Sequence, residues 1–110
     1  MPNTSREHFI QNAILREFGT RADMRIWRAN CGAATFQGQR VSFGVPGQAD
    51  LSGILNDGRR VEIEVKSTVG RQSAAQKSYQ AMIERFGGVY ILARSVDDVY
   101  AGLRAAGCVL

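Results

Sequence analysis

Hydrophobic residues recur along the chain with two different periods. Over residues 5–18 they recur at helical spacing, and Gly19 follows as a stop signal, so we expect an amphipathic helix over Ser5–Phe18. The same criteria predict helices over Ser73–Phe86 and over Val96–Ala106.

Shorter stretches alternate apolar with polar or basic residues, which is typical of strands. Met24–Ala29 is one such stretch, and Val89–Ala93 is a short apolar strand. Ala49–Leu55 and Arg59–Ser67 are predicted to form the two strands of a hairpin. The order of helix, strands, helix, strand and helix predicts an α/β fold with a mixed central β-sheet flanked by helices.

The region between the first strand and the hairpin is less regular. Small residues fill Asn30–Ala34, Val41–Val45 fits either a short strand or a loop, and Pro46-Gly47 marks a turn. The whole chain of 110 residues suffices for one hydrophobic core but is too short for two, so we expect a single domain over residues 1–110.

The hairpin admits two registers, which differ in the face that each side chain occupies. A two-residue loop would put Asp50 among the apolar residues of the second strand. A three-residue loop, Asn56–Gly58 with Gly58 in a left-handed conformation, places Asp50 opposite Glu64. Only this register separates an apolar face (Leu51, Gly53, Leu55, Val61, Ile63, Val65) from a polar face (Asp50, Ser52, Arg60, Glu62, Glu64, Lys66), so we predict it.

Two acids opposite each other repel unless a cation compensates them. Carboxylate oxygens suit a hard ion such as Mg²⁺, and Asp50 with Glu64 is the minimal pair. Lys66 shares their face, where it would contact a scissile phosphate or hold the attacking water. The pattern indicates phosphodiester hydrolysis. The alternative is a solvated hairpin face with cross-strand ion pairs, and Glu62 is expected to pair with a basic side chain outside the metal set.

Charge and composition narrow the functional classes. Fourteen Lys and Arg against ten Asp and Glu give a net charge of +4, which favours a polyanionic partner without establishing one. Cys31 and Cys108 form no CxxC pair and are expected to be buried thiols. His8 is the only histidine, too few for a His-metal nuclease. Without an apolar membrane span or signal segment, the expected location is cytoplasmic, in a bacterium or a phage-infected host.

An ordered series of motifs accompanies the hairpin: Phe43–Leu51, Glu64–Ser67, Ser73–Lys77 and Gly87–Tyr90. In this series, and over nearly its whole length, the chain resembles the VRR-NUC family of the PD-(D/E)XK nuclease superfamily. The resemblance implies a restriction-endonuclease-like core and a Mg²⁺- or Mn²⁺-dependent deoxyribonuclease. It further implies that Asp50, Glu64 and the main-chain carbonyl of Val65 bind the metal, and that Lys66 acts in catalysis.

Two more residues have competing interpretations. The resemblance implies that Glu7 completes the acidic cluster through the water shell of the metal and that Gln76 orients the site. However, Thr4–Glu7 and Ser73–Gln76 both match the capping box, in which the fourth residue returns to the backbone of the helix N-cap. The spacing alone favours capping, and the resemblance favours the site.

Basic side chains near the loop that follows the hairpin are candidates for DNA contacts, chiefly Arg71 and Lys77. Trp27 could stack on a base, but its place in a strand favours the core. No helix is rich in base-reading residues, so we expect recognition of DNA structure more than of sequence.

Symmetric cleavage of a four-way (Holliday) junction needs two active sites, and stand-alone members of the resembling family are thought to supply them as homodimers. The leading hypothesis is therefore a homodimeric, structure-selective endonuclease that resolves junctions. The alternatives are a nicking or restriction-like nuclease on ordinary duplex DNA and a non-catalytic DNA-binding module.

Overall fold

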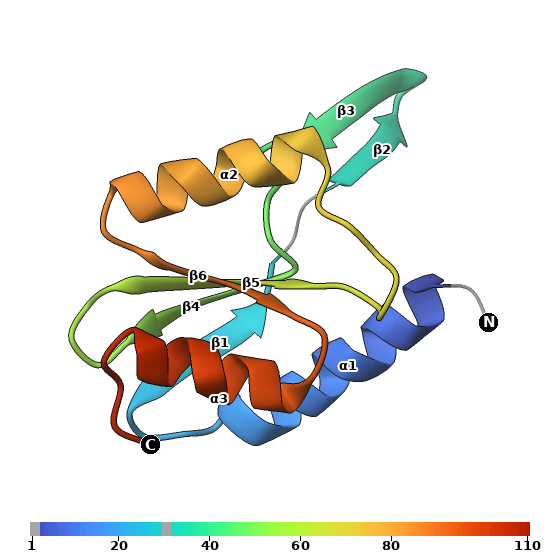
Figure 1. The fold of residues 1–110 in the computed structure, drawn as a ribbon. Helices are drawn as coiled ribbons and strands as arrows, with labels where there is room; N and C mark the ends of the chain where they lie inside the picture. The colour runs from blue at the N-terminus through green and yellow to red at the C-terminus, as the bar shows by residue number, and fades with distance from the viewer. Residues whose placement is uncertain (1–2, 30–31) are drawn as a thin grey trace.

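Helices and a mixed sheet form the body of the protein in residues 3–29 and 32–110, which the computed structural model describes, and a two-stranded ribbon projects from this body (Figure 1). The elements in chain order are α1 (Asn3–Phe18), β1 (Met24–Arg28), β2 (Gly32–Phe36), β3 (Gln39–Phe43), β4 (Leu51–Leu55), β5 (Arg60–Val65), α2 (Ala74–Arg85), β6 (Val89–Ala93) and α3 (Val96–Ala105). No helix in these residues is both long and apolar enough to cross a membrane.

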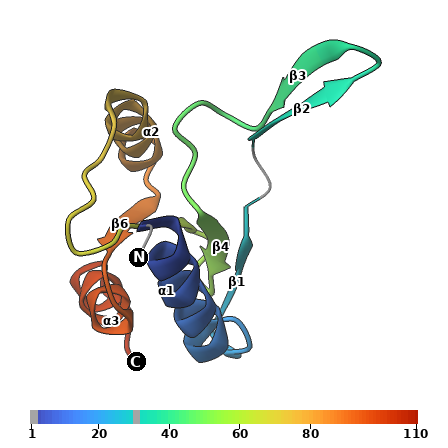
Figure 2. The same cartoon turned by 90° about the vertical axis from the view of Figure 1, so that its right-hand side faces the viewer.

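The central sheet has the strand order β1-β4-β5-β6. Its first three strands are antiparallel neighbours, and β6 runs parallel to β5. Helices α1 and α3 cover one face and α2 lies on the other, as the two views in Figures 1 and 2 show. The prediction of an α/β fold with a mixed sheet flanked by helices is therefore confirmed.

The hairpin of β4 and β5 has the predicted register. Leu51 lies opposite Ile63 and Gly53 lies opposite Val61, which requires a three-residue connection between the strands. Gly58 has a φ of 90°, as the left-handed position of that connection demands. The sequence pattern thus identified both the loop and the face of each side chain.

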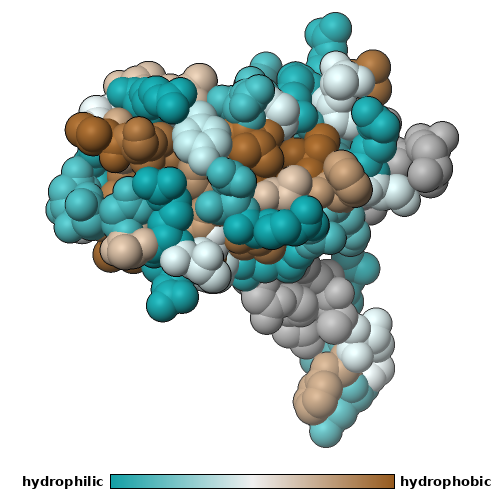
Figure 3. Space-filling model, turned by 90° about the horizontal axis from the view of Figure 1, so that it is seen from below, coloured by the Kyte–Doolittle hydropathy of each residue, from teal (hydrophilic) through white to brown (hydrophobic). Residues whose placement is uncertain are grey.

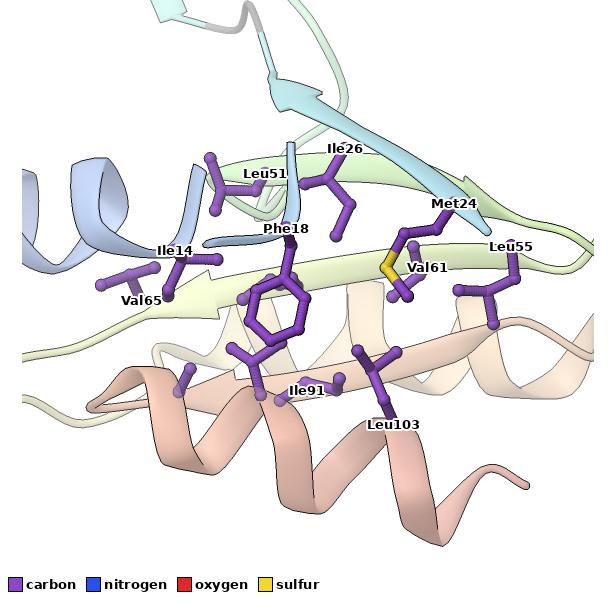
Figure 4. Close-up of a cluster of buried hydrophobic side chains, with 13 residues drawn as sticks. Ile14, Phe18, Met24, Ile26, Leu51, Leu55, Val61, Val65, Ile91 and Leu103 are labelled. Atoms are coloured by element: carbon purple, nitrogen blue, oxygen red, sulfur yellow. The ribbon is translucent and has the colours of Figure 1, made fainter. Parts of the chain in front are cut away.

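The apolar face of the hairpin builds the main core against α1 and α3 (Figure 4). Its buried members are Ile14, Phe18, Met24, Ile26, Leu51, Leu55, Val61, Ile63, Val65, Ile91, Ala93, Val99 and Leu103. A second cluster, made of Ala49, Tyr79, Ile83 and Tyr90, packs beneath α2 on the opposite face.

The opposite face of the hairpin is not a solvated one. Ser52, Glu62 and Glu64 are 2%, 0% and 3% exposed, because α2 and the loops around it cover this part of the sheet. The alternative of an exposed hairpin with surface ion pairs is therefore wrong for both glutamates.

The sequence did not reveal the two-stranded ribbon. Residues Gly32–Phe36, which follow no apolar alternation, pair with Gln39–Phe43 in an antiparallel sheet of their own. The two-residue turn Gln37-Gly38 has φ values of 51° and 80°, the signature of a type I′ hairpin turn. Of the ambiguous stretch Val41–Val45, the first three residues belong to the second strand of this ribbon.

Two further expectations concern isolated side chains. Trp27 is 47% exposed on the edge strand β1, so its assignment to the core is wrong. Cys108 is a half-buried free thiol, and Cys31 lies outside the described residues.

Candidate active site

Asp50 directly precedes β4 and lies beside the end of β5. Its Oδ2 accepts a hydrogen bond from the main-chain N–H of Val65 at 2.8 Å, and this fixes the carboxylate at the edge of the sheet. The N–H of Lys66 donates to the carbonyl of Ala93 on β6 at 3.0 Å. Since carbonyl and N–H point in opposite directions across a trans peptide, the carbonyl of Val65 points away from β6, toward the side of Asp50.

Glu64 occupies the centre of the site and is almost completely buried. Its Oε2 accepts a hydrogen bond from the Gln76 side-chain amide at 3.0 Å and lies 3.5 Å from Nζ of Lys66. Its Oε1 is buried and has no hydrogen-bond partner within the described part of the chain. A buried carboxylate oxygen without a partner is costly, and a bound cation would remove that cost.

The pKa values of Asp50 and Glu64 are both raised, as expected for two neighbouring carboxyl groups that are buried. Burial, followed by the negative charge of Asp50, raises the pKa of Glu64 to about 8, while Lys66 acts in the opposite direction. Burial also raises the pKa of Asp50, partly offset by the hydrogen bond from Val65. Both carboxyl groups therefore lose their protons at a higher pH than exposed carboxyl groups do, because burial and mutual repulsion disfavour two negative charges at this position.

The Gln76 side chain makes two sets of contacts at once, one with the N-cap of α2 and one with Glu64. Its N–H donates to Oγ of Ser73 at 3.1 Å, and its Oε1 accepts from the Ser73 N–H at 2.9 Å, which completes the capping box of α2. The same side chain donates from Nε2 to Glu64. A side-chain amide has an acceptor oxygen and a donor nitrogen, so it can cap the helix and hold the carboxylate simultaneously.

The Pro46-Gly47 turn holds this end of α2 in place. Gly47 has a φ of 76°, and a Cβ built on it would lie 2.2 Å from the carbonyl oxygen of Ala75, in the first turn of α2. The turn therefore contacts the helix backbone directly, one residue before Gln76. Close approach here depends on glycine.

Glu7 contacts the site region and does not cap a helix. Because α1 already includes Asn3, Thr4 lies inside the helix and cannot be its N-cap, so the capping interpretation is wrong for Glu7. Its Oε2 instead accepts a hydrogen bond from the N–H of Ser67 at 3.2 Å, next to Lys66. Its negative charge also raises the pKa of Asp50.

Arg94 is a residue of the site region that the sequence did not reveal. Its guanidinium donates to the carbonyl of Ser67 and to that of Gly70 at 2.8 Å, so it holds the loop that connects β5 to α2. The one signal in the sequence was topological: Arg94 follows β6 directly, and the ends of parallel neighbours β5 and β6 meet at one edge. The loop residue Arg71 and the helix residue Lys77 are both exposed.

Glu62 lies next to the site but is held by other partners. It is fully buried, and its Oε2 accepts from Nε of Arg60 at 3.3 Å. The hydroxyl of Tyr79, on α2, donates to its other oxygen. The expectation that Glu62 pairs with a basic side chain is confirmed, and the added bond to Tyr79 fastens α2 to the sheet one turn after Gln76.

No group of three or more His, Cys, Asp and Glu side chains in residues 3–29 and 32–110 is arranged to hold a metal ion. The donors that converge are the carboxylates of Asp50 and Glu64, with the carbonyl of Val65 on the same side. This set suits Mg²⁺, which keeps several of its waters and uses one or two protein carboxylates. A scan against models of known protein families finds no match to the chain, and neither does a search of curated proteins.

Proposed function

We propose that the protein is a Mg²⁺- or Mn²⁺-dependent endonuclease that hydrolyses phosphodiester bonds in DNA. The observation that carries the proposal is the partnerless oxygen of buried Glu64, which lies beside a second carboxylate and a lysine in the described part of the chain. Two neighbouring carboxylates can hold a divalent cation, and a nearby lysine supplies positive charge for the phosphate, which is the chemistry of metal-dependent phosphodiester hydrolysis.

The fold supports the same proposal. The mixed sheet, with helices on both faces and the acids where β4 begins and β5 ends, is compatible with a PD-(D/E)XK core of the VRR-NUC type. The order of Asp50, Glu64 and Lys66 along the hairpin is the other support for this assignment.

Each residue of the site has a distinct part in this function. Asp50, Glu64 and the Val65 carbonyl would hold the metal, and Glu7 would reach it through water. When bound, the ion supplies positive charge at the phosphate and lowers the pKa of an attacking water. Lys66, whose Nζ lies 3.5 Å from Glu64, would stabilise the negative charge that develops on the phosphate.

Other contacts keep the reacting groups in place. The N–H of Val65 fixes one oxygen of Asp50, and Gln76 fixes one oxygen of Glu64. Both donors are neutral, so they orient the carboxylates without adding a positive charge that would compete with the ion. Arg71 and Lys77, exposed on the loop and the first turn of α2, would contact the DNA backbone.

We further propose a branched substrate, cut by a homodimer, with four-way junctions as the leading case. One site cuts one strand in each encounter, so symmetric resolution requires two copies.

The purified protein should be incubated with labelled four-way junction, flap and plain duplex DNA, each with Mg²⁺ or EDTA. Preferential, paired cuts in the junction are expected with Mg²⁺. Equal cutting of plain duplex would favour the restriction-like alternative, and binding without cleavage in any metal would favour a non-catalytic module.

The stability of the metal-free protein should decrease as the pH rises. Between the ordinary pKa of a glutamate, 4.5, and the value of about 8 in the folded chain, Glu64 keeps a proton that the unfolded chain releases. The unfolded state therefore binds fewer protons, and the free energy of unfolding falls across this pH range. We expect the melting temperature to fall from pH 5 to pH 8, and Mg²⁺ to raise it more at pH 8 than at pH 5.

Thermal melts of two glutamine variants test the source of this effect. Glu64→Gln should remove most of the pH slope and the Mg²⁺ effect, whereas Glu84→Gln, at an exposed position of α2, should keep both. A slope that persists in Glu64→Gln would show that another group causes it.

A further inference from the structure

The ribbon of β2 and β3 projects from the body as an arm (Figures 1 and 3). Its strands pair only with each other among the residues described, and all six residues from Thr35 to Arg40 are exposed. Phe36, next to the turn, is 66% exposed. An isolated two-stranded hairpin is marginally stable in water, so an arm of this kind gains stability when a partner covers it.

The sequence of the arm and its surroundings is free of acidic residues. Between Asp23 and Asp50 the chain has no Asp or Glu and has three arginines, Arg25, Arg28 and Arg40. Arg28 donates to the neutral side-chain amides of Gln11 and Asn12, which leave its charge uncompensated. Arg25 and Arg40 are exposed. This charge pattern complements a polyanion.

The sheet continues this surface from the base of the arm. Trp27 lies opposite Ser52, which lies opposite Glu62, so Trp27 shares the sheet face of the candidate site. Helix α2 packs against β6 at the far edge of the sheet, and it leaves Trp27 and Ile54 each 47% exposed. Trp27 therefore lies in the same row across the sheet as Ser52 and Glu62, and Arg25 lies two residues earlier on the same face, opposite Ile54. Both are on the open edge strand that precedes the arm in the chain.

The arm and the candidate site are linked through the central sheet. Strand β1, which precedes the arm in the chain, pairs with β4, and β4 pairs with β5, which carries Glu64. Figure 2 shows the arm projecting beyond the β1 edge of this sheet. The major groove of B-DNA admits a two-stranded β-ribbon, whereas the deep, narrow major groove of double-stranded RNA does not.

We propose that the arm lies in the major groove of a DNA duplex whose backbone runs over Arg25 and Trp27 to the candidate site. This inference rests on the proposed function, and it names the surface that holds the substrate. Arg40 and Gln39, next to the turn, contact the groove, while Phe36 packs against sugars or base edges.

Binding measured without cleavage tests the inference. Fluorescence anisotropy with a short labelled DNA duplex in EDTA should show at least about tenfold weaker binding for Phe36→Ala/Arg40→Glu and for Arg25→Glu/Trp27→Ala. The slope of log affinity against log salt should become shallower by about one for each phosphate that a variant no longer neutralises. Arg16→Glu, near the other end of α1, makes a matched change of charge and should bind like the parent protein.

The outcomes separate this inference from the proposed function. Unchanged duplex binding by both double variants would overturn the inference, even if the parent protein cleaves DNA. Weakened binding by the double variants would support it, even if the parent protein cleaves nothing. A change of oligomeric state in the arm variant, seen by light scattering with DNA binding intact, would assign the arm to a second copy and overturn the inference. If the double variants lost affinity for double-stranded RNA by the same factor as for duplex DNA, the placement of the arm in the major groove would be overturned.

Discussion

Asp50→Asn is expected to abolish metal-dependent cleavage and, at the same time, to raise the melting temperature of the metal-free protein. The asparagine oxygen can still accept the hydrogen bond from the N–H of Val65, so the local fold is kept. Burial still raises the pKa of Glu64, but the second cause, the negative charge of Asp50, is removed together with the repulsion within the pair. We expect a gain of about 1 kcal/mol, or roughly 4–8 °C in melting temperature, at pH 8.

The expected loss of activity in the same variant is at least about 100-fold, because the metal loses one of its two carboxylates. Asp97→Asn, in the exposed first turn of α3, is the matched control. It should neither reduce cleavage nor raise the melting temperature of the metal-free protein. Cleavage at the parental rate by Asp50→Asn would contradict the assignment of Asp50. A melting temperature of Asp50→Asn below that of the parent protein would show that the Asp50 carboxylate stabilises the fold and that its repulsion with Glu64 does not destabilise it.

Gly47→Ala is expected to destabilise the protein strongly and to reduce cleavage. The new Cβ would lie 2.2 Å from the carbonyl oxygen of Ala75, and the residue would also have to adopt a φ of 76°. Because that carbonyl belongs to the backbone of α2, relief of the clash displaces the helix end that holds Gln76. We expect a loss of about 2–4 kcal/mol in the free energy of unfolding, measured by chemical denaturation.

Gly58→Ala is a well-matched control for this prediction. Gly58 has a φ of 90° but open space around its Cβ position, so alanine there adds backbone strain without a clash. A loss of about 1–2 kcal/mol is expected from the strain alone, with cleavage retained. Equal effects of the two substitutions would show that contact between the Pro46-Gly47 turn and α2 does not position the site.

The sequence predicted the parts of the fold in which local pattern and tertiary environment agree. In the β4–β5 hairpin, period-two alternation and one glycine were enough to determine the register and the position of Asp50 beside Glu64. The helices and β6 were predicted for the same reason. The burial of Glu62 and Glu64 could not be predicted from the hairpin sequence alone. It results from packing of α2, which follows the hairpin in the chain, over this face of the sheet.

Other features could not be predicted from the sequence because their cause is not local. The ribbon β2–β3 consists largely of small residues without alternation, and its strands pair with none of the sheet strands in the described body of the fold. Arg94 acts on two main-chain carbonyls, at Ser67 and Gly70, which carry no sequence signature. For Glu7 and Gln76 the capping pattern was identical, and only the start of each helix distinguishes the two residues.

Cleavage as a function of Mg²⁺ concentration, measured with the parent protein and Lys66→Ala, tests the central claim most directly. Lys66 lies 3.5 Å from Glu64 and is the only lysine or arginine side chain that forms an ion pair with either acid of the pair, among the residues that the structure describes. We predict no cleavage of labelled junction DNA in EDTA, a saturable rise with Mg²⁺ for the parent protein, and no measurable rise for Lys66→Ala. Cleavage in EDTA, or a parental rate in Lys66→Ala, would contradict the account.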